Sequence, residues 1–310
     1  MDLIHRVTQR LERADSVRAS ASGAAGLQTP PAAAASPMVA DIPGPVPPDG
    51  PTAFPSSRRS QDFALDFESL SAQGFLAPVP RTSRLSEEFR LIKRRLLNEI
   101  TSARAGRHKW PNVILVTSAR PGEGKTFTTL NLAISLVLDE RRPVLVIDGD
   151  IVQGSVGRSL GVGDARGLAD CLRDPTLPLS EVLLRDAENN FSFLPVGTAV
   201  ETATDLFSGT RMRDFVADVS QRYADRVILI DSAPLLSRTE SFALAAQVGQ
   251  VVLVVEAQRT SQAAVRSALD LLASSDNVSL ILNKAMREAV SEQFGSYYVD
   301  YQAPARASSD

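Results

Sequence analysis

Cysteine, histidine and tryptophan are scarce in this sequence of 310 residues, which contains 1 cysteine, 2 histidines and 1 tryptophan. The single Cys171 excludes an internal disulfide framework. With only His5 and His108 beside it, the sequence also lacks the ligands of a zinc cluster. We therefore expect a protein of a reducing compartment that is stabilised by a packed core.

An excess of positive charge is also missing, since 33 Lys and Arg residues face 36 Asp and Glu residues and the net charge is −3. Bulk nucleic-acid binding needs clustered basic residues that neutralise phosphates, so this class of partner is excluded. Apolar runs such as VILV and VVLVV fall far short of the ~20 residues that span a membrane. The opening MDLIHRVTQRLERAD interleaves charges and predicts no secretory signal, so we expect a cytoplasmic protein.

Four segments follow one another along the chain. Residues 1–18 predict a short amphipathic helix. Residues 19–61 are rich in alanine and proline and predict a disordered linker, because such a segment buries too little apolar surface to offset its ordering entropy. We expect one globular domain over residues 62–290 and a flexible polar tail over residues 291–310.

Within the globular region, short β-branched runs alternate with helical segments. The expected strands are VILVTS, VLVID, FSFLPV, VILID, VVLVVE and SLILN, and the expected helices cover residues 81–106, 125–139, 167–184, 203–223, 238–247 and 260–274. This alternation predicts an α/β fold with a mostly parallel sheet and helices on both faces, as a three-layer sandwich. Ligands of such sheets bind at the carboxyl ends of the strands, where candidate site residues should lie.

A glycine-rich loop, ARPGEGKT, joins the first strand to its helix at residues 119–126. This is the P-loop pattern with Ala119 in place of the first glycine, and it predicts a P-loop NTPase. Backbone N–H groups of such a loop face nucleotide phosphates, Lys125 reaches the β and γ oxygens, and the Thr126 hydroxyl ligates Mg²⁺. The alternative, a glycine turn that merely joins strand and helix, does not account for the Lys-Thr pair. The expected nucleotide-binding residues are Ala119, Arg120, Pro121, Gly122, Glu123, Gly124, Lys125, Thr126 and Phe127.

Carboxylates end two further apolar strands. VILID ends in Asp231, the Walker B arrangement that orients a bound Mg²⁺, and VLVIDGD ends in Asp148 and Asp150. One strand-terminal aspartate alone is more often a helix cap or turn residue. Two such strands beside a P-loop favour catalysis, and the predicted metal ligands are Thr126, Asp148 and Asp231. A turn or subunit contact remains the alternative role for Asp150.

Taken together, these motifs resemble the bacterial tyrosine kinases. The resemblance rests on PGEGKT followed by NLA, on VILIDSAPLL, on Asn283-Lys284 after the last strand, and on the tyrosine-bearing tail GSYYVDYQ. EEFRLIKRRLL, TESFALAAQVGQVVLVVEAQRT and LNKA are similar to the tyrosine autokinases found beside exosortase-linked exopolysaccharide systems. The resemblance covers residues 62–301 and also implies that Asn283 belongs to the ATP site.

The resemblance implies a non-specific protein-tyrosine kinase that uses ATP and Mg²⁺ and phosphorylates Tyr297, Tyr298 and Tyr301 in trans, within a homo-oligomeric ring. It also implies a separate membrane-embedded co-polymerase that activates the kinase and controls polysaccharide polymerisation and export. The chain is then expected at the inner face of the plasma membrane, held there by this partner. The resemblance implies no nucleic-acid partner.

Four features depart from the family pattern or modify it. Glu87, Arg90 and Lys93 match the spacing of the family's oligomerisation helix, but a lysine stands at the last position, and it lacks the bidentate fork of arginine. IVQGSV follows Asp150 where the family has a turn with Arg-Pro, and Ala233 replaces the first proline of a pair. The tail carries three tyrosines, a thinner cluster than usual.

Transfer of a phosphoryl group to tyrosine needs a proton acceptor, because the phenol titrates near ~10. We expect Asp148 to take this proton, although an ordinary aspartate near ~3.9 is a weak base. In a loose phosphoryl-transfer transition state the position of the acceptor matters more than its basicity. Lys125 then neutralises phosphate charge, Asp231 fixes the metal, and Asp150 completes the catalytic set. The mobile, polar surroundings of the tyrosines indicate a substrate rather than a packing segment.

Two other functions share these motifs. One is a nucleotide-switch ATPase of the partition or septum-positioning type, whose P-loop carries a signature lysine where this chain has Arg120-Pro121. The other is a scaffold for export machinery that binds nucleotide without catalysis, which retention of all the acidic residues disfavours. Detection of phosphotyrosine separates the kinase from both.

Overall fold

The computed structural model describes residues 61–78, 83–103, 109–151, 153–198, 206–207 and 209–285. The chain divides into two units, residues 1–54 and 55–310. The predicted helix at 1–18, all of the predicted linker except its last residue, and the predicted tail at 291–310 lie outside the described residues. The three C-terminal tyrosines therefore also lie outside the described residues.

One sheet of eight strands organises the described part of the second unit, in the order β1-β4-β5-β3-β6-β2-β7-β8. The strands are β1 (Gln61–Asp62), β2 (Val113–Ser118), β3 (Val144–Gly149), β4 (Leu184–Asp186), β5 (Phe191–Leu194), β6 (Val227–Ser232), β7 (Gln250–Glu256) and β8 (Val278–Asn283). From β5 to β8 all neighbours are parallel, whereas β4 runs antiparallel to β5. The predicted mostly parallel sheet is confirmed.

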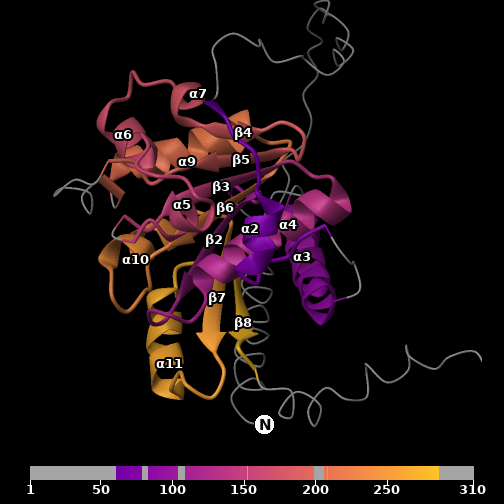
Figure 1. Cartoon of the computed structure of the whole chain (residues 1–310). Coiled ribbons are helices and arrows are strands. Elements are labelled where there is room, and N and C mark those ends of the chain that lie inside the picture. Colours follow the sequence, from indigo (N-terminus) through magenta and orange to yellow (C-terminus); the bar gives the residue numbers. More distant parts are fainter. Residues whose placement is uncertain are drawn as a thin grey trace, which may run out of the picture. The chain divides into compact units, whose positions relative to one another are not determined.

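Helices cover both faces of this sheet (Figure 1). One face packs against α2 (Phe67–Ala72), α3 (Arg84–Ala103), α4 (Lys125–Glu140) and α5 (Ser155–Ser159). The other packs against α6 (Leu168–Arg173), α7 (Leu179–Val182), α9 (Thr210–Arg222), α10 (Thr239–Ala245) and α11 (Gln262–Leu271). Alternate side chains of a strand point to opposite faces, so Val113 and Leu115 join one core cluster while Ile114 and Val116 join the other.

The short strand β4 departs from the sequence-based prediction, which placed helix up to residue 184. Leu184 and Asp186 turn inward and are buried, while Arg185 between them is exposed. Asp186 accepts a hydrogen bond of 2.8 Å from the backbone N–H of Leu65, which joins the segment after β1 to this hairpin. A strand of 3 residues offers too short an alternation to be recognised in the sequence.

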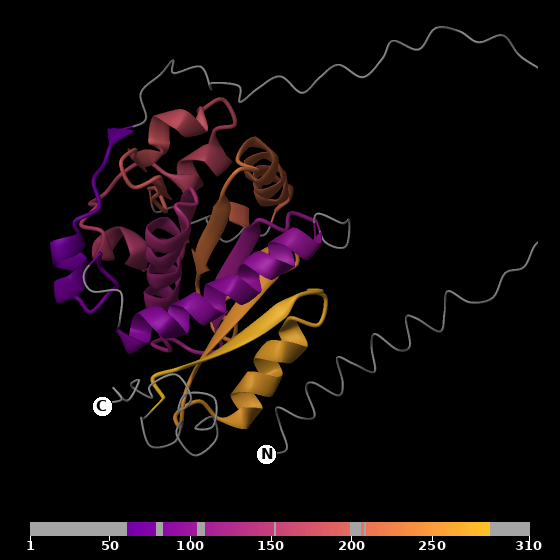
Figure 2. The same cartoon turned by 90° about the vertical axis from the view of Figure 1, so that its right-hand side faces the viewer.

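Helix α3 lies beside α4 on one face of the sheet, as Figure 2 shows. Its predicted apolar face is confirmed: Phe89, Leu96 and Ile100 are buried, and Leu85 and Ile92 pack against the same core cluster. In the part of the chain that the structure describes, no helix is both long enough and apolar enough to cross a membrane.

The position of Lys93 differs from the prediction for the charged side of α3. It was assigned to an oligomerisation face with Glu87 and Arg90, but its side chain is only 1% exposed. Its ammonium donates to Asp139 Oδ2 at 2.6 Å and to the carbonyl of Ser135 at 3.1 Å, both on α4. The long aliphatic stem of a lysine lets it cross an apolar interface to reach such acceptors. Lys93 therefore joins α3 to α4 within one chain.

Glu87 and Arg90 lie closer to solvent. They form an ion pair of 2.5 Å one turn apart on α3, and Arg90 Nε also lies 3.8 Å from Asp139 Oδ2. A subunit contact through these two residues stays a prediction.

Candidate nucleotide site

The P-loop lies between the end of β2 and the start of α4, at the carboxyl edge of the sheet. Gly122 and Gly124 both have positive φ, 84° and 97°. Residues with a Cβ rarely adopt this conformation, and a Cβ on Gly124 would also overlap the side-chain amide of Asn283. The two glycines therefore let the backbone turn sharply into α4, which leaves its first N–H groups without helical partners and available to phosphate oxygens.

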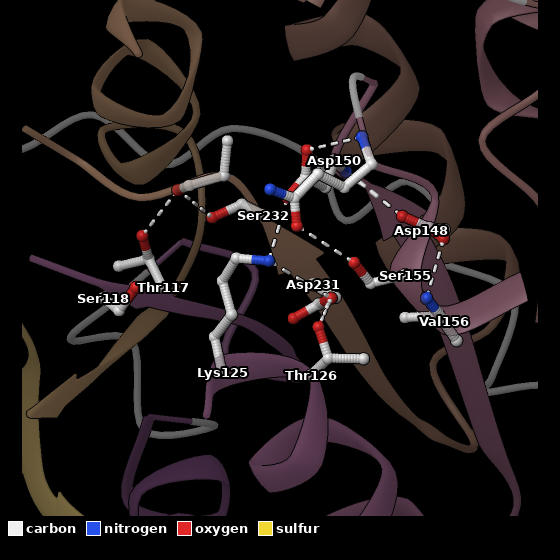
Figure 3. A network of polar contacts seen from close by, with 12 residues as sticks. Thr117, Ser118, Lys125, Thr126, Asp148, Asp150, Ser155, Val156, Asp231 and Ser232 are labelled. Atoms are coloured by element: carbon white, nitrogen blue, oxygen red, sulfur yellow. Dashed lines mark hydrogen bonds and ion pairs between the residues drawn. The ribbon is translucent and has the colours of Figure 1, made fainter. Parts of the chain in front are cut away.

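Lys125, the first residue of α4, is buried among carboxylates (Figure 3). Its Nζ lies 2.9 Å from Asp150 Oδ2 and 4.0 Å from Asp231 Oδ2. Burial by itself would lower the pKa of this ammonium, but the nearby charges of Asp231 and Asp150 outweigh that effect and raise it. Lys125 therefore carries a full positive charge at neutral pH, at the point where a P-loop lysine meets phosphate.

Thr126 and Asp231 form a second contact at the same edge. The Thr126 hydroxyl donates to Asp231 Oδ2 at 2.7 Å, and Thr129, one turn later on α4, donates to Asp231 Oδ1 at 3.1 Å. Burial raises the pKa of Asp231 to about 6 even though Lys125 and both hydroxyl groups favour its charged form. The contribution of Thr129 was missed in the sequence, although its position three residues after Thr126 on a helix signals it.

These oxygens suit a hard divalent cation. Among the described residues no group of three or more His, Cys, Asp or Glu side chains is arranged to hold a metal by itself. Mg²⁺ usually takes only one or two protein oxygens and completes its shell with water and nucleotide phosphates. The Thr126 hydroxyl and the Asp231 carboxylate, in contact with one another, supply such a pair. The residues present fit Mg²⁺ bound together with a nucleotide.

Asp148 lies opposite Asp231 on the neighbouring strand, β3. It is fully buried, and its carboxylate faces the backbone that follows the strand: Oδ1 accepts from Asp150 at 3.2 Å, and Oδ2 accepts from Val156 at 3.1 Å and from Gly157 at 3.3 Å. Burial and the charge of Asp231 raise its pKa to about 7, which outweighs these hydrogen bonds. Asp148 thus has the basicity that the sequence did not reveal, and it is tied to the start of α5.

Asp150, just beyond β3, makes the direct contact with Lys125. Its Oδ1 also accepts from the backbone N–H of Gln153 at 3.2 Å, so it fixes the turn that leads to α5. The sequence named Asp148, Asp150 and Lys125 as one set, and the structure brings all three to one edge of the sheet (Figure 3). Asp150, and not Asp148, is the lysine's hydrogen-bonding partner.

The end of β8 meets the opposite side of the P-loop. Asn283 Nδ2 donates to the carbonyl of Glu123 at 2.9 Å, and Lys284 Nζ donates to the carbonyl of Gly122 at 2.7 Å. The buried carboxylate of Glu123 accepts from the Arg120 backbone at 2.8 Å and from the Thr260 hydroxyl. Asn283 was expected near the nucleotide and does lie at the loop, whereas Thr260 carried no signal in the sequence.

The remaining predicted residues of the loop divide into two kinds. Ala119 is buried at the end of β2, while Arg120 and Pro121 are exposed at the outer edge of the loop. The ring of Phe127 stacks on Phe75 with centroids 5.4 Å apart and meets Phe89 edge-on, so its side chain packs against the helical layer. The predicted phosphoacceptors Tyr297, Tyr298 and Tyr301 lie outside the described residues.

Comparison with known proteins places this site in a family. Residues 111–287 match the family model described as an AAA domain. AmsA, a putative tyrosine-protein kinase of Erwinia amylovora, is 34% identical over 143 residues, 46% of this chain and 19% of AmsA. The tyrosine-protein kinase wzc of Salmonella typhimurium is 27% identical over 198 residues, 63% of this chain and 27% of that protein. The chain therefore spans less than a third of the length of these curated relatives.

Among solved structures, the kinase domain of VpsO superposes with a TM-score of 0.52 at 29% identity, covering 63% of this chain and 98% of that domain. The predicted resemblance to the bacterial tyrosine kinases is confirmed, and the narrower exosortase-linked branch stays a prediction. The matched region includes the whole P-loop pattern, with Lys125 and Thr126. The chain belongs to the family of P-loop proteins described as AAA domains, and the relatives it matches are tyrosine-protein kinases.

Proposed function

We propose that the chain is an ATP-dependent protein-tyrosine kinase whose acceptors are Tyr297, Tyr298 and Tyr301 of a second copy of the chain. The observation that carries this proposal is the contact set of Lys125, Asp150, Thr126 and Asp231 at the carboxyl edge of the sheet, next to a carboxylate whose pKa is raised to about 7. The relatives' names supply the acceptor type, because a P-loop alone would serve any nucleotide chemistry.

In the proposed reaction, a tyrosine oxygen forms a bond to the γ-phosphorus of ATP. The bond from that phosphorus to the bridging oxygen breaks, ADP leaves with the electron pair, and the phenolic proton passes to a carboxylate. Lys125 holds a positive charge against the β and γ oxygens throughout. Thr126 and Asp231 would hold Mg²⁺, which when bound supplies further charge neutralisation on the same oxygens.

Asp148 is the proposed proton acceptor. A carboxylate with a pKa of about 7 is largely ionised at slightly alkaline pH and is a far better base than an exposed aspartate. Asp150 acts as a positioning residue, since one of its oxygens binds Lys125 and the other holds the turn before α5, whose first N–H groups bind Asp148. Movement of that turn would uncover an oxygen of Asp148, so the turn and the base act together.

Mass spectrometry of the purified chain, with and without Mg·ATP, tests the kinase directly. We expect phosphotyrosine on the C-terminal cluster of the wild-type chain and none on a Lys125→Met chain. A mixture of two variants tests transfer between copies: the Lys125→Met chain keeps its tyrosines, and an active partner carries Phe at all three positions. Phosphotyrosine on the Lys125→Met chain supports transfer in trans.

The same experiment distinguishes the alternative functions. Hydrolysis of ATP without phosphotyrosine would replace the kinase with a nucleotide-switch ATPase, and binding without hydrolysis would indicate a scaffold. A ring of copies and a membrane-embedded co-polymerase that controls exopolysaccharide polymerisation are the partners we propose, with the chain held at the inner face of the plasma membrane by the latter. If membranes that contain such a partner leave the rate of phosphotyrosine formation unchanged, that part of the proposal fails.

A further inference from the structure

An open groove begins at Thr126, at the edge of the candidate nucleotide site, and extends away from the P-loop toward α2 and α5. It has a volume of about 380 Å³ and is lined by Gln73, Phe75, Thr126, Phe127, Ser155 and Arg158, with Ser159 at its border. A smaller groove of about 120 Å³ shares Gln73, Arg158 and Ser159 with it and continues toward Asp66. We call the two together the acceptor trough.

The lining of the trough combines three kinds of chemistry. The Thr126 hydroxyl contacts the Walker B carboxylate. The stacked rings of Phe75 and Phe127 are half-buried, with their planes 27° apart. The exposed side chain of Arg158, on α5, makes a hydrogen bond of 3.4 Å with Ser155. A ligand that matches this lining carries a hydroxyl, an aromatic ring and a negative charge.

The C-terminal segment of the chain carries these groups close together. GSYYVDYQ contains Tyr298 and, two residues later, Asp300, which is the only acidic residue between Glu292 and Asp310. In an extended segment, residues two apart point to the same side and lie ~6.6 Å apart. Tyr298 follows Ala285, the last described residue, by 13 residues, and a stretch of that length spans up to ~43–47 Å.

We propose that the acceptor trough binds residues 297–301 of a second copy of this chain, with the ring of Tyr298 against Phe75 and Phe127 and the carboxylate of Asp300 at Arg158. This inference rests on the proposed kinase function and adds an acceptor subsite to it. Arg158 selects tyrosines that have a carboxylate two residues downstream. Phe75 and Phe127 set the depth to which a ring enters, which places its hydroxyl beside Thr126 rather than farther from the loop.

A peptide assay with matched charge changes tests the subsite. The acceptor peptide covers residues 293–305, QFGSYYVDYQAPA, in which Asp300 is the only charged side chain. We expect an Asp300→Lys peptide to show a KM roughly 5-fold or more above that of the parent with wild-type enzyme, since exposed charge pairs contribute modestly. An Arg158→Glu enzyme should show a similar rise in KM for the parent peptide. In both cases kcat should change much less than KM.

The decisive measurement combines the Arg158→Glu enzyme with the Asp300→Lys peptide. The Arg158→Glu enzyme should prefer the Asp300→Lys peptide over the parent, and the preference should weaken at high salt because the pair is exposed. The matched control is Arg213→Glu, an exposed arginine on α9, which packs on the opposite face of the sheet and should leave both KM values unchanged. The peptide variants need no change in the enzyme, so a folding defect in one enzyme variant does not block the test.

The outcomes separate this inference from the function on which it rests. If the wild-type enzyme phosphorylates the parent peptide but neither charge reversal changes KM, the trough is not the acceptor subsite and the kinase stands. If the Arg213→Glu control raises KM as much as Arg158→Glu does, a general charge effect is responsible and the subsite is rejected. If the wild-type enzyme modifies neither the peptide nor itself, the kinase and the subsite fall together.

Discussion

Replacing Asp148 by asparagine should make the folded domain more stable at alkaline pH while abolishing proton transfer. The carboxylate is fully buried, and its pKa rises from an ordinary 3.8 to about 7. This shift of ~3 pH units corresponds to about 4 kcal/mol of unfavourable free energy for keeping Asp148 charged in the folded state. An asparagine of the same shape avoids that cost.

The sign follows from proton binding. Between pH 3.8 and about 7 the folded state keeps the Asp148 proton while the unfolded state releases it, so the free energy of unfolding decreases as pH rises. Roughly 2–3 kcal/mol of this loss falls between pH 5 and pH 8. Against it, an asparagine keeps only one acceptor oxygen for the N–H groups that now bind Asp148, at a cost of about 1–3 kcal/mol. A net gain of about 1–3 kcal/mol at pH 8 remains.

Urea unfolding of both proteins at pH 5, 6, 7 and 8 measures this difference. The free energy of unfolding of the variant should rise relative to that of the wild type as pH rises, by roughly 2–3 kcal/mol across the series, because the other carboxylates are common to both. With Mg·ATP well below saturation, kcat/KM of the wild type should rise through an apparent pKa near 7, the value of the free enzyme, and the variant should be inactive at every pH. A difference in unfolding free energy that is flat with pH would refute the argument from burial, and full activity of the variant would remove Asp148 as the base.

Three further changes test other parts of the structure. Lys93→Met should destabilise the domain by about 1–3 kcal/mol in urea unfolding, because it removes the charged hydrogen bond to Asp139 and the bond to the Ser135 carbonyl, and an unchanged stability would contradict the intramolecular role. Thr126→Ala should raise the Mg²⁺ concentration for half-maximal nucleotide binding about tenfold by removing the hydroxyl beside Asp231, and an unchanged Mg²⁺ dependence in calorimetry would argue against that site. Cys171, whose pKa burial raises to about 11, should react with iodoacetamide at pH 8 at least tenfold more slowly than a free thiol; equal rates would show that it is exposed.

Most of the fold could be predicted because its signals are periodic and local. Apolar β-branched runs mark the parallel strands, and both faces of such strands are covered, so nearly every residue in them is buried. The glycine loop between β2 and α4 turns the backbone into the helix through positive-φ glycines, and the P-loop pattern in the sequence predicts this turn directly. Because these strands are parallel, their carboxyl ends lie at one edge of the sheet. Lys125, Asp148 and Asp231 could therefore be grouped from the sequence alone.

What could not be predicted depends on the direction of side chains after a turn. Asp148 and Asp150 are two residues apart, yet one binds Lys125 and the other faces α5, because Asp150 lies just beyond the strand and the chain turns there. Lys93 shows the same limit on a helix: its neighbours in the charged pattern face solvent, but an acidic acceptor on α4 lies within reach of its long stem. Such partners are far apart in the sequence and leave no periodic signal.

The charges at the carboxyl edge of the sheet also indicate how bound Mg·ATP would change the protonation of the site. Asp148, Asp150 and Asp231 are all buried, and among the described residues Lys125 is the only cationic side chain that forms an ion pair with any of them. Burial raises the pKa of Asp148 and Asp231, and the single positive charge of Lys125 does not offset this effect for three carboxylates. A divalent cation at Thr126 and Asp231 would lower both values and favour the ionised carboxylates. Binding of Mg·ATP should therefore stabilise the fold and, at the same step, convert Asp148 toward the form that accepts a proton.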